Sequence, residues 1–250
     1  MNWARKRITE LQLAFMLLTR LPAGQLSGSV PDLAAARWAF PLVGCVIGSL
    51  IALCYIGLNQ VGLPPILAAL LALAIAIIAT GGLHEDGLAD SADGFGGGQD
   101  KEQKLAIMKD SHIGSYGVLA LIILMTARIA SLSYLPADQM LIIWLIGCAI
   151  FSRLIMVGYL CFLPSAREKG LGSQASGNAS TDFIVAIIIS APFLLFGGTI
   201  MLYCIVFMTI IALFWALLAK KQIGGQTGDI CGAGQMLCET AGWMALLAVI

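Results

Sequence analysis

Residues 140–163 read MLIIWLIGCAIFSRLIMVGYLCFL, an apolar run whose only charge is Arg153. A helix needs about 20 apolar residues to cross a bilayer. Further runs of this kind lie at 41–58, 64–83, 117–135 and 183–219. The last of them would be longer than the bilayer is thick if it formed one helix, at about 1.5 Å per residue. Because Pro192 and Gly197-Gly198 offer a turn, we predict two spans there.

The composition of the whole chain indicates an integral membrane protein. Hydrophobic residues make up 59% of the 250 residues and charged residues 11%, whereas soluble domains carry about 25% charged residues. The tail 240–250 is apolar but short. We therefore predict an all-α fold, a polytopic transmembrane helical bundle of six spans, or seven if the tail crosses, in one domain over residues 1–250. Fourteen basic residues balance fourteen acidic ones, which disfavours nucleic acid as a partner.

Positive charges gather in polar segments between the apolar runs. The segments that hold twelve of the fourteen Lys and Arg residues are 1–40, 84–116, 164–182 and 220–239. Because positive residues mark the cytoplasmic side, we predict that these segments are cytosolic and that the first forms an amphipathic helix on the membrane surface. In the first span, Gly44 and Gly48 form a GxxxG pair, which favours close approach of another helix but is also common by chance.

One polar segment is strongly acidic. Half of the fourteen acidic residues lie between 84 and 114, most densely in GGLHEDGLADSADGFGGG, residues 81–98. Asp86, Asp90 and Asp93 stand at i, i+4 and i+7, so on a helix they share one face. Carboxylates this close repel one another unless a cation neutralises them, and oxygen ligands alone select Mg²⁺, Mn²⁺ or Ca²⁺. We predict a metal site that acts on phosphates; the alternative is a solvated acidic loop that ends a helix.

Three other polar segments suit phosphate binding. The motif IMKDSHIGSYG carries Lys109, Asp110 and Ser111 beside glycines, and SAREKGLG carries Arg167. The guanidinium fork of arginine fits phosphate oxygens, and glycine-rich turns such as GGQTGD at 224–229 expose backbone N–H groups to anions. Each motif alone is also compatible with a simple turn. Their predicted location on one side of the membrane favours a shared site.

Two arginines lie inside predicted spans. A guanidinium there costs at least about 2.5–3.5 kcal/mol, so Arg128 and Arg153 each require a partner. We predict that Arg153 either reaches a substrate phosphate or a metal-bound carboxylate, or joins an internal ion pair. His84 and His112 are expected to make local hydrogen bonds, with a general base as the alternative for His84.

The blocks GGLHEDGLADSADG, IMKDSHIGSYG, AREKGLG and GGQTGD, in this order, closely resemble the bacterial cobalamin synthase family, the adenosylcobinamide-GDP ribazoletransferases. The resemblance extends from about Arg20 to Glu239. It implies a Mg²⁺-dependent enzyme of the bacterial inner membrane that joins adenosylcobinamide-GDP to α-ribazole or its 5′-phosphate and releases GMP. The site residues that it implies are Asp86, Asp90 and Asp93 for the metal, and Lys109, Asp110, Arg167, Thr227 and Asp229 for the substrates.

Two positions depart from the family pattern. Glu85 replaces an apolar residue and is either a bystander or an additional metal ligand, and Met236 replaces a second acid ahead of Glu239, whose role is therefore open. For the reaction we expect Asp93 to accept the proton of the attacking hydroxyl. The expected partners are the two substrates, the lipid bilayer, and either further copies of the chain or other late corrinoid enzymes.

Two other classes of protein share parts of this pattern. A CDP-alcohol-type lipid synthase would use the same metal chemistry on a different acceptor, although the aspartate motif of that family is only loosely similar. A metal- or proton-coupled transporter would place its acids near the middle of the bilayer. Here nearly all acids lie in predicted cytosolic loops, which disfavours transport.

Overall fold

The computed structural model describes residues 3–26, 31–177 and 180–250, and within these ranges it contains helices and no β-strand. Parts of the predicted segments 1–40 and 164–182 lie outside the described residues. The helices are α1 (Trp3–Leu18), the 3₁₀ helix η1 (Leu33–Ala39), α2 (Phe40–Gln60), α3 (Pro65–Thr80), α4 (Leu83–Gly97), α5 (Lys101–Ile107), α6 (Ser115–Tyr134), α7 (Gln139–Phe162), α8 (Leu171–Gln174), α9 (Ser180–Ile223) and α10 (Gly228–Val249). The all-α prediction is confirmed.

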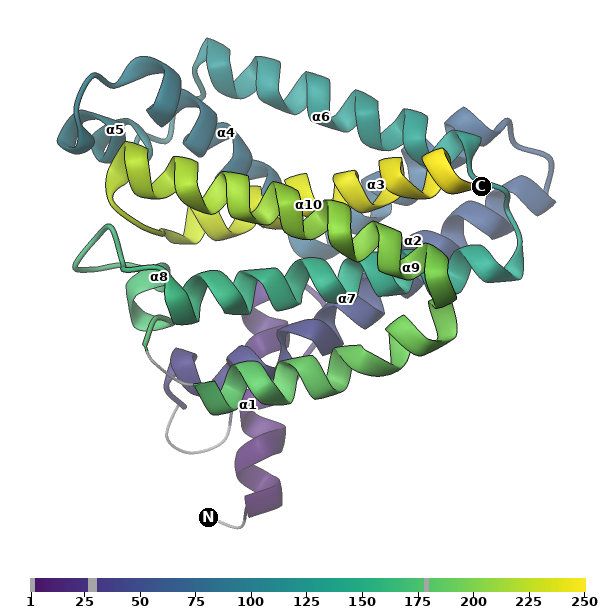
Figure 1. The fold of residues 1–250 in the computed structure, drawn as a ribbon, viewed down its shortest axis with the longest axis horizontal. Helices are drawn as coiled ribbons and strands as arrows, with labels where there is room; N and C mark the ends of the chain where they lie inside the picture. The colour runs from purple at the N-terminus through teal and green to yellow at the C-terminus, as the bar shows by residue number, and fades with distance from the viewer. Residues whose placement is uncertain (1–2, 27–30, 178–179) are drawn as a thin grey trace.

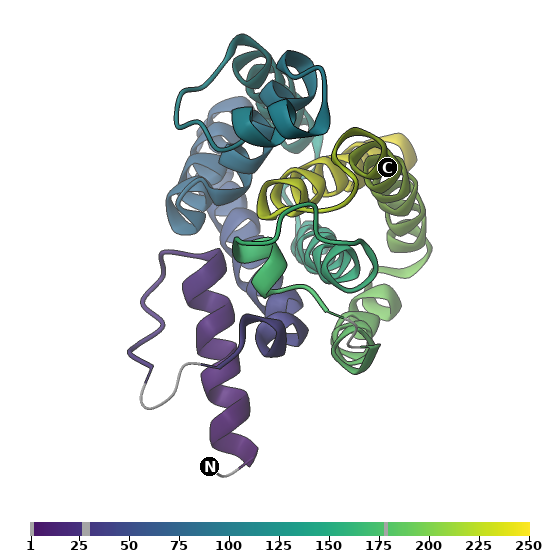
Figure 2. The same ribbon diagram turned by 90° about the vertical axis from the view of Figure 1, so that its left-hand side faces the viewer.

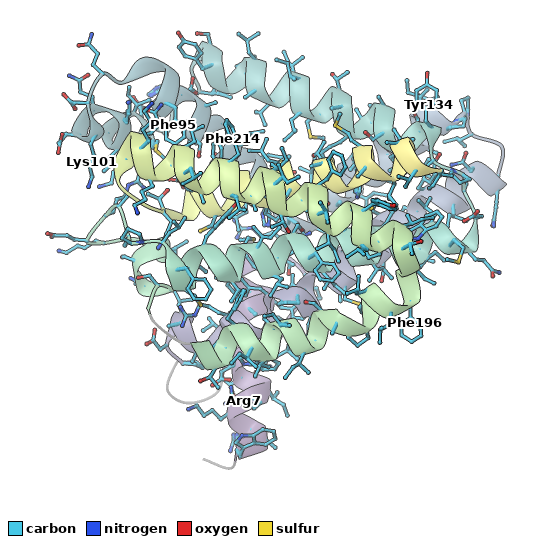
Figure 3. The ribbon with its side chains drawn as sticks, viewed as in Figure 1. Arg7, Phe95, Lys101, Tyr134, Phe196 and Phe214 are labelled. Carbon is cyan, nitrogen blue, oxygen red and sulfur yellow. The ribbon has the colours of Figure 1, made fainter. Side chains whose placement is uncertain are left out.

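The long helices run roughly along one direction, with α7 packed against α2, α9 and α10 (Figure 1). The short helices α5 and α8 lie at one end of this bundle, which faces the viewer in Figure 2. Lys101 marks this end, and Tyr134 and Phe196 lie toward the opposite end (Figure 3). Helix α1 runs across the direction of the long helices, as a helix that lies along a membrane surface would.

Four helical segments are long and apolar enough to cross a membrane: Leu33–Gln60, Ser115–Tyr134, Gln139–Phe162 and Thr181–Ile223. Helices α3 and α4 are bent by 89° relative to each other and form a fifth candidate if they make one broken span. The predicted turn in 183–219 is confirmed, because α9 is broken at Gly198, where φ is 63° and the chain reverses direction (Figure 1). Pro192 lies within the first half of α9. The number of spans stays a prediction.

The acidic segment and the last polar segment also contain helix. Asp86, Asp90 and Asp93 lie on α4, which confirms their helical spacing. Helix α10 begins at Gly228, inside the segment 220–239 that was expected as a cytosolic loop, and Glu239 is buried in the bundle. The polar residues at the start of α10 and the apolar tail 240–250 therefore belong to one continuous helix.

Helices α2 and α7 approach each other closely at the GxxxG pair. A Cβ atom on Gly44 would lie 2.4 Å from the carbonyl oxygen of Ala149, and one on Gly48 would lie 2.8 Å from the Cα atom of Ile146. Neither distance leaves room for a side chain, so the predicted close approach of another helix is confirmed.

Replacing Gly48 by leucine should therefore separate α2 from α7 and destabilise the protein by about 1–3 kcal/mol, the usual cost of overpacking. The measurement is the thermal unfolding midpoint in detergent micelles. Gly57→Leu is the matched control, because a Cβ on Gly57 of the same helix meets nothing within 4 Å. Equal midpoints for the two variants would contradict the packing argument.

Candidate active site

A cavity of about 270 Å³ opens where α4, α8 and the start of α10 meet. We call it the site cavity. Its polar side is formed by Asp86 of α4, Arg167 of the segment before α8, and Thr227 and Asp229 at the start of α10. The structure thus brings together residues from three of the sequence motifs that are far apart in the chain.

The contact between α4 and α10 fixes the acidic side of the cavity. A Cβ atom on Gly87 would lie 2.8 Å from the carbonyl oxygen of Asp229, so the two backbones touch at this point. Gly87 directly follows Asp86 and lies three residues before Asp90, which shares a helix face with Asp86. The close approach therefore sets the carboxylates of α4 beside the first turn of α10.

The start of α10 is held by side-chain capping. Thr227 Oγ1 accepts a hydrogen bond from the backbone N–H of Ile230 at 3.3 Å and donates one to Asp229 Oδ2 at 3.2 Å. Arg167 Nη1 lies 3.3 Å from the same carboxylate oxygen, and its Nη2 donates to the carbonyl of Leu105 in α5 at 3.2 Å. A helix N-terminus favours negative charge, and here the carboxylate of Asp229 lies at that terminus beside a guanidinium.

Negative charge predominates in this cluster. Burial, together with the smaller effects of the charges of Asp86 and Asp229, raises the pKa of Asp90 to about 7, and Arg167 opposes this rise. Burial also raises the pKa of Asp229, against the lowering effect of Arg167. Helix α4 and the start of α10 lie outside the four candidate spans. Of these carboxylates, Asp86 and Asp229 line the site cavity and Asp90 does not, and only Asp229 is paired with Arg167.

A complete metal site is not formed by protein groups alone. Within the residues that the structure describes, no group of three or more His, Cys, Asp or Glu side chains is arranged to hold a metal ion. Mg²⁺ usually takes one or two carboxylates and completes its shell with water and substrate phosphates. Mg²⁺ bound together with a phosphate-bearing substrate therefore stays a prediction for the carboxylates of α4.

Asp93 is engaged elsewhere, although it lies on the same helix. Its two carboxylate oxygens accept hydrogen bonds from the backbone N–H groups of Gly114 at 2.7 Å and Gly117 at 2.8 Å, at the start of α6. The residue is only 8% exposed and does not line the site cavity. Asp93 thus ties α4 to α6, and its role as metal ligand or proton acceptor stays a prediction.

A second, more open cavity of about 630 Å³ adjoins the first, and we call it the outer cavity. Lys109 and Glu102 line it from the α5 side, and Arg167 and Lys169 line both cavities. Asp110 and Ser111 are exposed and line neither of them. Asp110 instead pairs with its neighbour His112, with 2.7 Å between Oδ1 and Nδ1.

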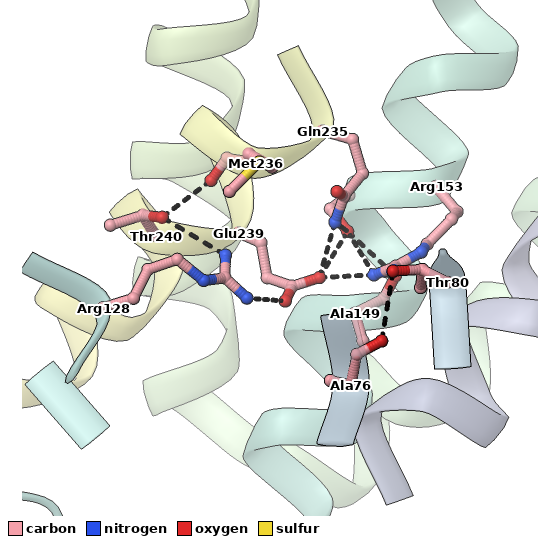
Figure 4. A network of polar contacts seen from close by, with 10 residues as sticks. Ala76, Thr80, Arg128, Ala149, Arg153, Gln235, Met236, Glu239 and Thr240 are labelled. Atoms are coloured by element: carbon pink, nitrogen blue, oxygen red, sulfur yellow. Dashed lines mark hydrogen bonds and ion pairs between the residues drawn. The ribbon is translucent and has the colours of Figure 1, made fainter. Parts of the chain in front are cut away.

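Arg153 takes part in a buried network rather than in the site cavity (Figure 4). Its guanidinium forms an ion pair with Glu239 of α10, which also accepts hydrogen bonds from Arg128 at 2.7 Å, Ser152 at 3.0 Å and Gln235 at 2.7 Å. Of the two expectations for Arg153, the internal ion pair is confirmed.

The two residues before Asp86 face this network. Glu85 lines a small cavity together with Arg128 and Arg153, and not the site cavity, so the structure does not place it beside Asp86 as an additional ligand. His84 is buried between the small cavity and the site cavity. Neither of its ring nitrogens has a hydrogen-bond partner among the described residues, so the local hydrogen bonds expected for it are not formed.

The sequence analysis missed the apolar part of the cavity lining. The residues concerned are Leu17 and Leu18 of α1, Phe40 of α2, and Met156 and Leu160 of α7. These residues lie within ordinary apolar helical patterns, which carry no signal for a binding role. Only the packing of three helices reveals them.

Comparisons with known proteins agree with the motifs. A family model described as cobalamin-5-phosphate synthase matches residues 10–247. Relatives named adenosylcobinamide-GDP ribazoletransferase occur in Bradyrhizobium diazoefficiens (38% identity over 94% of this chain and 92% of the relative), Azorhizobium caulinodans (40%, 94% and 93%) and a Polaromonas species (37%, 98% and 99%). No solved structure gives a significant match.

Proposed function

Because the chain belongs to the cobalamin-5-phosphate synthase family, we propose that it transfers the cobinamide phosphate moiety of adenosylcobinamide-GDP to α-ribazole or α-ribazole 5′-phosphate and releases GMP. The observation that carries the proposal is the site cavity, where Asp86, Arg167 and Asp229 meet. Phosphoryl transfer needs positioned positive charge on the phosphates and an acceptor for a proton. The cavity provides groups for both tasks.

We propose Asp86 and Asp90 as the residues that hold Mg²⁺. Their support is the spacing of the two carboxylates on one face of α4, together with a pKa of Asp90 that burial and, to a smaller extent, the charges of Asp86 and Asp229 raise. When bound, Mg²⁺ would neutralise the pyrophosphate of the donor and stabilise the charge that develops on the leaving GMP.

The remaining steps are assigned to groups of the chain itself. Arg167 binds the phosphates of the donor, and its hydrogen bond to Leu105 keeps the guanidinium in place. A hydroxyl oxygen of ribazole attacks the phosphorus on the cobinamide side, the bond from this phosphorus to GMP breaks, and GMP leaves with the bonding electrons. Asp229, whose pKa is raised by burial, accepts the hydroxyl proton. Asp229 takes this role in the proposal because it lines the cavity, whereas both oxygens of Asp93 are engaged.

We further propose that the site faces the cytosol of a bacterial inner membrane. Lys109, Arg167 and Lys169 gather around the two cavities, and Lys101 lies at the same end of the bundle (Figure 3). Positive residues favour the cytoplasmic side, where phosphorylated substrates are also found.

Purified protein in detergent or liposomes, given adenosylcobinamide-GDP, α-ribazole 5′-phosphate and Mg²⁺, should produce GMP and the joined corrinoid in equal amounts. EDTA should remove the activity, and added Mg²⁺ should restore it, because the carboxylate pair holds the substrate phosphates only through a cation. Both products are followed by chromatography. Folded protein that gives no corrinoid product, but releases a nucleotide from a CDP- or GDP-linked lipid, would identify a lipid synthase instead.

A further inference from the structure

The site cavity has an apolar part of its lining that the polar reaction groups do not explain. We infer that it binds the aromatic base of the acceptor, so that helices α1 and α2 select which ribazole-like nucleoside reacts. This inference rests on the proposed function. We call the five residues Leu17, Leu18, Phe40, Met156 and Leu160 the base wall.

All five residues of the base wall are apolar; four of them are buried and Leu17 is half-buried. Leu18 is 3% exposed, Phe40 1% and Met156 5%. The same cavity is also lined by Asp86, Arg167 and Asp229. A ligand that fills this mixed lining must therefore carry an apolar part as well as hydroxyl or phosphate groups.

Of the two substrates, the acceptor has this polarity. The base of ribazole is a dimethylated bicyclic aromatic ring without amino or carbonyl groups on its edge, and its sugar carries the hydroxyls. The guanine of the donor has N–H donors and a carbonyl on its edge, which would lose their hydrogen bonds against the base wall at a substantial cost. The corrinoid is excluded by size, since 270 Å³ is slightly below the volume of pockets that hold drug-sized molecules.

The orientation that follows agrees with the rest of the site. With the base against Phe40 and Met156, the sugar points toward Asp86 and Asp229, where a hydroxyl must lose its proton. The outer cavity shares Arg167 and Lys169 with the site cavity, so the phosphates of the donor reach the same point from the other side. Two substrates thus approach through two cavities.

Contacts of α1 hold the base wall in place. Glu10 accepts a hydrogen bond from Trp38 Nε1 of η1 at 2.9 Å. At the end of α1, the backbone N–H of Arg20 donates to the carbonyl of Ala79 in α3 at 2.7 Å. Because α1 is tied to neighbouring elements at its middle and just after its end, the wall is preformed, which favours discrimination between bases of different size.

Leu17→Trp tests this inference, because Leu17 lines the cavity and is half-buried at the edge of the bundle. The larger side chain should raise the KM for α-ribazole 5′-phosphate about tenfold or more and leave the KM for adenosylcobinamide-GDP within about twofold. It should also shift the kcat/KM ratio toward an acceptor with unmethylated benzimidazole by about tenfold, since one methyl group in a tight apolar pocket has an effect of this size. Met16→Trp is the matched control, because Met16 is exposed and does not line the cavity.

Three results would overturn the inference. These are a raised KM for the donor instead of the acceptor, unchanged constants in folded Leu17→Trp protein, or an equal effect of Met16→Trp. If Leu17→Trp does not fold, Leu17→Ala serves instead and should shift preference toward larger bases. Failure of the proposed function is distinguishable, because unaltered protein would then make no joined corrinoid with any acceptor.

Discussion

Asp86→Asn should lower kcat for GMP release by about 10²–10³-fold or more, the usual effect of removing one group that stabilises transition-state charge. The substitution keeps the size and hydrogen-bonding ability of the side chain but removes the charge that we propose as a ligand of Mg²⁺. Asp86 is exposed and lines the site cavity. Among the described residues, its carboxylate makes no hydrogen bond that the substitution would remove. The bundle should therefore remain folded.

The decisive measurement is a titration of activity with Mg²⁺. Asp90→Asn is expected to give the same loss, because Asp90 shares its charge environment with Asp86. Asp138→Asn is the matched control: Asp138 is exposed and caps α7 by accepting from the N–H of Leu141 at 3.0 Å, and asparagine caps a helix as well as aspartate does. Asp86→Asn protein that reaches normal turnover at saturating Mg²⁺ would refute the metal assignment.

The acidic helix and its neighbours could be predicted from the sequence because the signal was local. The spacing of Asp86 and Asp90 fixes their common face on any helix. The positive-inside rule then places the motif that contains Arg167 and the one that contains Asp229 at the same end of the bundle. Once the polar segments are confined to one end of the bundle, few packings of the helices would keep them from contacting one another.

Other parts of the site depend on which helices pack against each other, and helix packing cannot be predicted from the local pattern of a single sequence. Asp93 has the same spacing signal as Asp86, yet its carboxylate turns to the N–H groups of Gly114 and Gly117 because α6 begins there. The base wall around Phe40 is formed by three helices and consists of ordinary apolar residues. In both cases the local pattern is the same whether the residue binds a ligand or a neighbouring helix.

The partner of the buried Arg128 and Arg153 likewise could not be predicted from the sequence. An arginine inside a span requires a partner, but the position of the partner along the chain is unconstrained. Glu239 lies 86 residues from Arg153 and 111 from Arg128. It could be read as part of a cytosolic segment only because the start of α10 is rich in glycine and polar residues.

The second large effect concerns the stability of this network. Glu239→Gln should destabilise the protein by about 3–5 kcal/mol, because it leaves the buried guanidiniums of Arg128 and Arg153 without the carboxylate that they share. The measurement is the thermal unfolding midpoint in detergent micelles, with Asp138→Asn as the exposed control. Arg128 retains one favourable contact, since its guanidinium lies 4.3 Å from the ring centre of Trp243.

The double variant Glu239→Gln with Arg153→Gln distinguishes a charge effect from general damage to the core. Removing one positive charge together with the negative one should recover about 0.5–3 kcal/mol, the coupling energy expected for residues in one network. If Glu239 serves only the fold, the fraction of Glu239→Gln protein that remains folded should keep its kcat. A fully stable Glu239→Gln protein without turnover would contradict this assignment, because it would place Glu239 in the reaction or in transport of a proton through the bundle.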